Sequence, residues 1–103
     1  MLEKLEAIKR RWQEVEQQLS DPKVIGDMKL FTKLNKEYKE LLVINEVYKR
    51  YKNVIGNIES SKEIIRTETD KEFLDMAKTE LDELIQEKNK MDEEVKVLLI
   101  PKD

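Results

Sequence analysis

Apolar residues recur every three or four positions along almost the whole chain, and this period constrains the fold more than any other feature of the sequence. It is the period of an α-helix with one buried face, whereas a half-buried strand alternates every second residue. The chain contains only two glycines and two prolines, which argues against a turn-rich β fold. We therefore predict an all-α protein.

The first stripe of apolar residues predicts a helix that ends at the segment LSDP, residues 19–22. Its members are Leu2, Leu5, Ile8, Trp12, Val15 and Leu19. Either Ser20 or Asp21 could cap a new helical turn, and Pro22 would occupy a position where a missing N–H costs nothing. We expect a turn with a short helical piece here, followed by a further adjustment at Gly26.

A second stripe runs through residues 27–66 and predicts one long helix. Its members are Met28, Phe31, Leu34, Tyr38, Leu41, Ile44, Tyr48, Tyr51, Ile55, Ile58 and Ile65. Gly56 and the Ser60–Ser61 pair are the weak points, and Ser60 with Glu63 could start a separate helix through a capping box. Because the apolar spacing continues through both points, we expect one continuous helix with room for a bend.

A third helix is predicted to begin at the segment TETD, residues 67–70. Thr69 and Glu72 have the spacing of a capping box, in which two backbone N–H groups are satisfied reciprocally. The stripe of this helix consists of Phe73, Ala77, Leu81, Leu84, Met91, Val95 and Leu98. Three further apolar residues are expected to widen its face: Leu74, Met76 and Ile85. Lys88 is the one polar interruption.

Short connections force consecutive helices to run in opposite directions, so we predict an elongated, coiled-coil-like antiparallel three-helix bundle with one long central helix. The charges favour pairing of the last two helices: residues 27–66 carry 9 basic and 6 acidic side chains, whereas residues 67–103 carry 6 and 12. We place the helical domain at residues 1–97. Pro101 disfavours further helix, so residues 98–103, LLIPKD, are expected to be the start of a linker that leaves the helical domain.

The sequence offers little chemistry for catalysis. It has no cysteine and no histidine, which excludes thiol nucleophiles, imidazole bases and the usual zinc ligand sets. Acidic runs occur at 82–83 and 92–94, but adjacent residues on a helix point about 100° apart and do not converge on one ion. We predict no catalytic residue, no metal and no cofactor, and we therefore expect that the chain is not an enzyme.

No stretch approaches the ~18 apolar residues of a membrane span, and the first residues lack the continuous apolar segment of a secretory signal. We expect a soluble, cytoplasmic chain.

Two basic clusters are the candidates for contact with rRNA or protein. Their residues are Lys9, Arg10, Arg11, Lys49, Arg50 and Lys52. In the second cluster Tyr48 and Tyr51 interleave with the basic residues and could stack on bases. They also lie three apart on the apolar stripe, so the favoured interpretation is that both pack inward. Trp12, beside the first cluster, is expected to anchor the core.

Three stretches carry a resemblance to a known family: LSDP at 19–22, LNKEYKELLVINEVYKRYK at 34–52 and LLIPKD at 98–103. In this order and spacing they resemble the N-terminal helical domain of bacterial class I peptide chain release factors, and release factor 1 more than release factor 2. The resemblance implies that residues 98–103 lead into a strand of a following β-rich domain. It covers all 103 residues but only a fraction of such a factor. The family's Gly-Gly-Gln motif and its Pro-x-Thr-type stop-codon reader are absent, so no catalytic or codon-reading residue is assigned.

The resemblance implies an accessory role in translation termination. In the family this domain reaches toward the stalk base of the large ribosomal subunit, near ribosomal protein L11 and its rRNA. It also implies a contribution to contact with the methyltransferase that modifies the Gly-Gly-Gln glutamine. Two other roles stay open: a self-contained structural or chaperone-like coiled coil that self-associates through its apolar faces, and independent nucleic-acid binding with a steep salt dependence.

Overall fold

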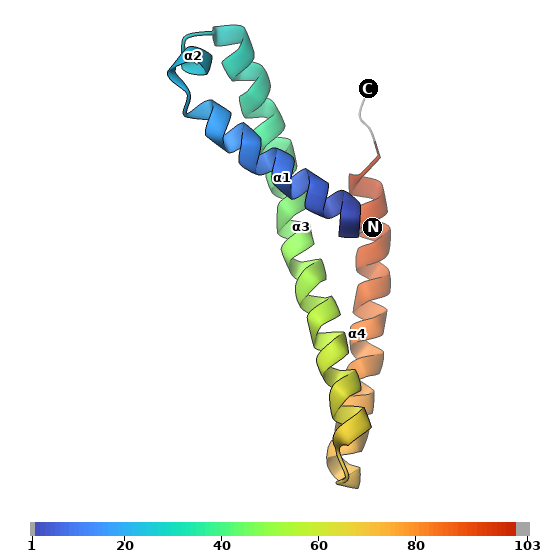
Figure 1. Ribbon diagram of the computed structural model, residues 1–103. Helices are drawn as coiled ribbons and strands as arrows, with labels where there is room; N and C mark the ends of the chain where they lie inside the picture. The colour runs from blue at the N-terminus through green and yellow to red at the C-terminus, as the bar shows by residue number, and fades with distance from the viewer. Residues whose placement is uncertain (1, 101–103) are drawn as a thin grey trace. The chain divides into compact units, whose positions relative to one another are not determined.

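The computed structural model describes residues 2–100, and within them it contains four α-helices and no strand (Figure 1). The helices are α1 (Leu2–Leu19), α2 (Pro22–Ile25), α3 (Met28–Thr67) and α4 (Lys71–Leu98). They form two compact units, Met1–Tyr48 and Lys49–Asp103. The first holds α1, α2 and the beginning of α3, and the second holds the remainder of α3 and α4. The prediction of an all-α fold is confirmed.

Aspartate caps build the connection between α1 and α3. The side chain of Asp21 accepts a hydrogen bond from the backbone N–H of Lys23 at 2.9 Å and caps α2, so Asp21 rather than Ser20 is the N-cap. The side chain of Asp27 accepts one from the N–H of Leu30 at 3.2 Å, where α3 begins. These two carboxylates satisfy helix N–H groups that have no partner within the helix.

One hydrophobic cluster in the core of the first unit takes a buried residue from each of its helices: Val15 of α1, Val24 of α2 and Leu34 of α3. Leu19, Phe31, Tyr38 and Leu41 pack against this cluster. Trp12 stacks on Tyr38 with the ring centroids 5.6 Å apart and the ring planes at 23°. The stripe on α1 therefore packs against the matching stripe on the first part of α3, as predicted.

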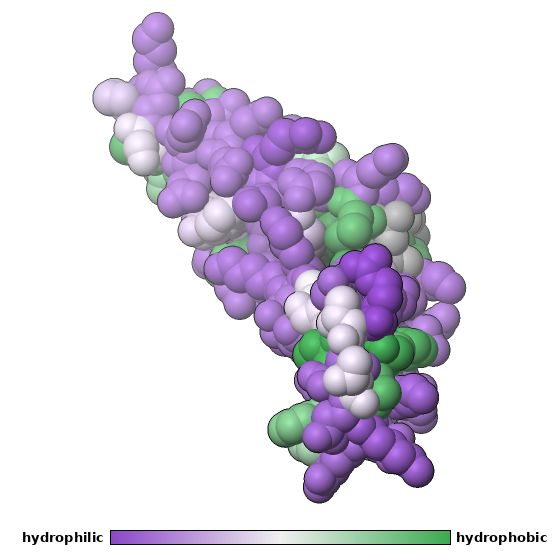
Figure 2. Space-filling model, turned by 60° about the horizontal axis from the view of Figure 1, so that its bottom comes forward, coloured by the Kyte–Doolittle hydropathy of each residue, from purple (hydrophilic) through white to green (hydrophobic). Residues whose placement is uncertain are grey.

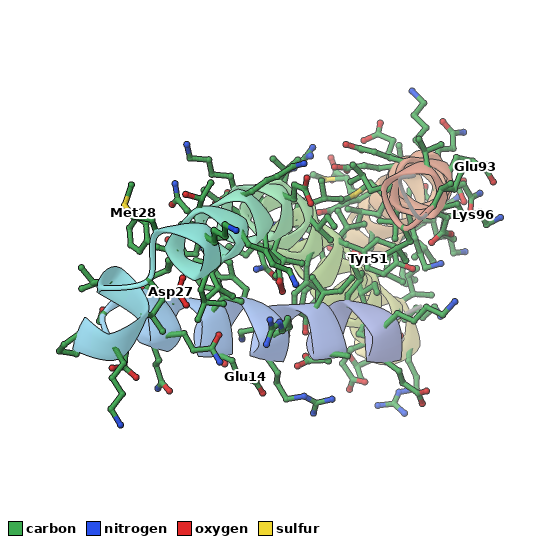
Figure 3. All side chains as sticks on the ribbon, turned by 90° about the horizontal axis from the view of Figure 1, so that it is seen from above. Glu14, Asp27, Met28, Tyr51, Glu93 and Lys96 are labelled. Carbon is green, nitrogen blue, oxygen red and sulfur yellow. The ribbon has the colours of Figure 1, made fainter. Side chains whose placement is uncertain are left out.

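Met28 departs from the predicted stripe. Its side chain is 77% exposed and projects away from the helices at the start of α3 (Figure 3). Helical spacing shows that residues share one face of a helix. It does not show that another helix covers that face as far as its first residue. The expectation that Met28 contributes to the core is wrong.

α3 is continuous over 40 residues, which corresponds to about 60 Å at ~1.5 Å per residue. It does not break at Gly56, and Ser60 does not start a separate helix. Ser61, the next residue, is only 3% exposed. The predicted continuity of the long helix is confirmed.

In the second unit α3 and α4 lie side by side and run in opposite directions from the turn at 68–70 (Figure 1). The inward-facing residues of α4 alternate at three and four positions: Leu74, Ala77, Leu81, Leu84, Lys88, Met91, Val95 and Leu98. On α3 the buried residues are Tyr51, Val54, Ile58 and Ser61. This alternation is the pattern of a coiled coil.

Two details of these stripes differ from the prediction by one residue. Val54 is buried, whereas Ile55 is only partly so; Leu74 faces inward, whereas Phe73 is 58% exposed. Met76 and Ile85, expected to widen the buried face, are both exposed. Neighbouring apolar residues are about 100° apart on a helix, and the position of the partner helix decides which of them is covered.

The N-cap of α4 is Asp70, so the prediction of Thr69 is wrong by one residue. The side chain of Asp70 accepts hydrogen bonds from the N–H groups of Glu72 at 2.9 Å and Phe73 at 3.4 Å. The Glu68 side chain accepts from the N–H groups of Thr69 and Asp70, both at 3.1 Å. Glu68 thus holds the turn, and the capping role passes to Asp70.

α4 ends at Leu98, and the N–H of Leu99 still bonds to the carbonyl of Val95. The predicted boundary between residues 97 and 98 therefore falls in the last turn of this helix and stays a prediction. Of the predicted strand entrance, residues 101–103 lie outside the described part of the chain.

Candidate functional site

The six basic residues predicted as contacts fall into two groups, one in each compact unit. Lys9, Arg10 and Arg11 lie on α1, and Lys49, Arg50 and Lys52 lie on α3 at the start of the second unit. Each group occupies about one helical turn, so its side chains spread around the helix rather than converge on one point.

The guanidinium of Arg11 pairs with two carboxylates of the first unit. Its Nε and Nη2 donate to the two carboxylate oxygens of Glu37 at 2.5 and 3.1 Å, and its Nη1 lies 3.5 Å from Glu14. The hydrogen bond to Glu37 raises the pKa of Arg11. A bidentate pair of this kind fixes both side chains, so Arg11 links α1 to α3. Its guanidinium is already paired with a carboxylate and is a weak candidate for binding a phosphate. Arg10, in contrast, is exposed and makes no ion pair among the residues described.

The tyrosines of the second group are not available for base stacking. Tyr48 and Tyr51 are each 3% exposed, and the Tyr48 hydroxyl donates to the Glu6 carboxylate within the first unit. The inward-packing interpretation is confirmed.

Lys49, Arg50 and Lys52 are all exposed. Arg50 lies 3.3 Å from the Glu94 carboxylate, in a surface pair of a kind worth only ~0.2 to 1 kcal/mol. Such a pair can open to admit a stronger anionic partner.

A polar network in the second unit explains the one polar residue on the inner stripe of α4. The Tyr51 hydroxyl donates to Asp92 Oδ1 at 2.6 Å, and the Lys88 ammonium donates to Asp92 Oδ2 at 3.1 Å. The same ammonium lies 5.7 Å from the centre of the Tyr51 ring. Lys88 and Asp92 are four residues apart on one helix, a spacing visible in the sequence, but the tyrosine comes from α3 and was not foreseen.

Each member of this network has a shifted pKa. Burial, followed by the hydrogen bond to Asp92, raises the pKa of Tyr51. The hydrogen bond to Asp92 raises the pKa of Lys88 against the opposing effect of burial. Burial alone would raise the pKa of Asp92, but the hydrogen bonds from Tyr51 and Lys88 together with the Lys88 charge lower it below 3.8. All three groups are partnered, so the network serves to pair α3 with α4.

The acidic run at 92–94 is paired in the same way. Glu93 pairs with Lys96 at 3.2 Å, both projecting from the outer side of α4 (Figure 3), and Glu94 pairs with Arg50. Within residues 2–100 no group of three or more acidic side chains is placed to hold a metal ion. In the same range no helix is both long enough and apolar enough to cross a membrane.

Comparison with known proteins identifies the family of this chain. The family model of the PCRF domain matches residues 8–103. Over all 103 residues the chain is 52% identical to peptide chain release factor 1 of Cytophaga hutchinsonii, 46% to that of Amoebophilus asiaticus and 40% to that of Clostridioides difficile. It spans 29% of the length of each of these relatives. No solved structure is significantly similar to the chain.

Proposed function

The chain belongs to the PCRF domain family, and on that basis we propose that it is the non-catalytic N-terminal domain of a translation termination factor. The observation that carries the proposal is the similarity of its whole length to peptide chain release factor 1, of which it spans 29%. No Gly-Gly-Gln sequence occurs in these 103 residues. Recognition of the stop codon and promotion of peptidyl-tRNA hydrolysis would then belong to the remainder of the factor, which would act in the cytoplasm.

We further propose that the domain contacts the ribosome near the stalk base of the large subunit, in the region of ribosomal protein L11. The exposed basic residues support this, because Lys and Arg side chains that reach phosphates supply most of the affinity for RNA. Lys49, Arg50 and Lys52 are stronger candidates than Arg11, whose guanidinium is held by Glu37. A contact with the methyltransferase that modifies the Gly-Gly-Gln glutamine is a second proposed interaction of the factor.

Binding of the 103-residue chain to large ribosomal subunits tests the ribosome contact. The double variant Lys49→Glu/Lys52→Glu is expected to weaken binding and to flatten its dependence on salt, because two phosphate contacts are lost. The double variant Lys33→Glu/Lys36→Glu is the matched control, since it makes the same change at the same spacing on exposed positions of α3. Equal weakening by both variants would show that binding depends only on the overall charge of the chain. It would contradict the assignment of Lys49 and Lys52 as ribosome contacts.

The division of labour has its own test. The chain alone is expected to release no peptide from ribosomes programmed with a stop codon. Release above the uncatalysed background would contradict the proposal that this domain is non-catalytic, whatever the outcome of the binding experiment.

A further inference from the structure

The turn end of the α3–α4 hairpin carries an open groove of about 680 Å³. Ala77, which is 5% exposed, lies at its base, and its apolar walls are Ile64, Phe73 and Met76, which are 43%, 58% and 62% exposed. Figure 2, which turns this end of the hairpin toward the viewer, shows hydrophobic side chains at the surface among hydrophilic ones. The inner stripe of α4 already packs the hairpin through Leu74 and its successors, so these walls are not needed for pairing.

The charged residues that line the groove are all acidic: Glu68, Asp75, Glu80 and Glu83. Asp75, Glu80 and Glu83 make no ion pair within residues 2–100. The nearest lysines of α4 lie on the side of Asp75, but at about 100° per residue Lys78 is roughly 200° and Lys71 roughly 180° around the helix from Glu80. One side of the hairpin thus combines an exposed apolar strip with uncompensated negative charge.

We propose that this groove binds a basic amphipathic segment of a partner protein. Apolar side chains of the segment would enter between Ile64, Phe73 and Met76, and its lysines or arginines would pair with Glu80 and Glu83. An amphipathic helix laid into an apolar groove is a common mode of peptide recognition, and complementary charge at the edge fixes the orientation of such a segment.

The charge of the groove disfavours the other occupants. RNA phosphates would meet four carboxylates and no basic side chain. A second copy of the chain, bound through the same face, would bring two sets of carboxylates together. The charge of this groove therefore disfavours self-association through it. Self-association through the apolar faces stays a prediction.

On the ribosome, the proposed partner would be a basic protein segment rather than rRNA, and that extension rests on the function proposed above. The chemistry of the groove does not depend on it. The 103-residue chain can fail to bind the peptide and still bind ribosomes through Lys49 and Lys52. It can also bind the peptide and fail to bind ribosomes.

The probe is a fluorescently labelled helical peptide with leucines at positions i, i+3, i+4 and i+7 and lysines elsewhere. Its counterpart has every lysine replaced by glutamate. Fluorescence anisotropy is expected to show saturable binding of the lysine peptide at low salt, weaker binding as salt is added, and no binding of the glutamate peptide.

Two pairs of variants locate the site. Glu80→Lys is expected to weaken binding of the lysine peptide roughly three- to tenfold, because a favourable charge contact becomes repulsive. Asp82→Lys makes the same charge change two residues away on the other side of α4 and is expected to change binding less than about twofold. Met76→Ser is expected to weaken binding about fivefold through lost apolar contact, whereas Val97→Ser, at another exposed apolar position of α4, should leave it unchanged.

Circular dichroism of each variant verifies that α-helix content is retained, as expected for exposed positions. Several results would overturn the proposal: no binding of the lysine peptide, equal effects of Glu80→Lys and Asp82→Lys, or binding of a labelled RNA hairpin to the chain that Met76→Ser weakens. A dimer in sedimentation that Met76→Ser abolishes would assign the groove to a second copy instead.

Discussion

Replacing Gly56 by alanine is expected to raise the free energy of unfolding by about 1 kcal/mol. Gly56 lies well inside α3 and is exposed to solvent. Apart from its chain neighbours and the adjacent backbone of α3, a Cβ atom built on it would meet no atom within 4 Å, and its φ is not positive. Nothing in the folded chain therefore requires glycine here, while the unfolded chain gains entropy from it. The whole propensity difference between glycine and alanine in a helix should appear as stability.

Thermal and urea unfolding followed by circular dichroism at the helical band measure this gain. For a chain of this size, about 1 kcal/mol corresponds to an increase in Tm of roughly 4 to 8 °C. Ser60→Ala, at another exposed position on the same helix, is expected to gain about half as much. Gly56→Pro is expected to lose about 3 kcal/mol or more, because proline removes a backbone hydrogen bond and clashes with the preceding turn.

An unchanged or lowered stability of Gly56→Ala, with the expected gain for Ser60→Ala, would refute this reasoning. It would mean that α3 bends at Gly56 in solution and uses a backbone conformation that alanine resists. The continuity of the 40-residue helix would then have to be abandoned.

Three further changes test other parts of the structure. Asn45→Leu is expected to raise the free energy of unfolding by about 1 kcal/mol or more in urea titrations, because Asn45 is 5% exposed and its amide has no partner among the described residues; a loss would show that the amide is satisfied in solution. Asp92→Asn is expected to lower stability at neutral pH and to flatten its acid dependence. The lowered pKa of Asp92 means that the unfolded chain binds this proton first, so the stabilisation is present above pH 3.8 and lost as pH falls through the native pKa; an unchanged acid limb in unfolding curves would contradict this. Asp70→Ala is expected to lose about 1 kcal/mol through the missing N-cap, whereas Thr69→Ala should change stability by less than about 0.5 kcal/mol; the reverse order in thermal unfolding would restore Thr69 as the cap.

The sequence alone determined the helices and, to within about one residue, the turns that separate them. The apolar spacing, Pro22 and the aspartates near the turns act on neighbours within one helical turn, so their effect can be read locally. The continuity of α3 followed in the same way, because the stripe passes Gly56 without losing its phase. The inward position of Tyr48 and Tyr51, and with it the loss of a base-stacking site, was also foreseen from spacing.

Only the tertiary structure decided what each helical face meets. Val54 and Ile55 are equally apolar and about 100° apart, and the position of α4 buries the first and leaves the second at the edge. Lys88 is tolerated on an inner stripe because a carboxylate and a tyrosine from two helices meet it there. The acidic groove likewise exists only where the ends of α3 and α4 come together, since a local pattern defines a face but not its neighbour.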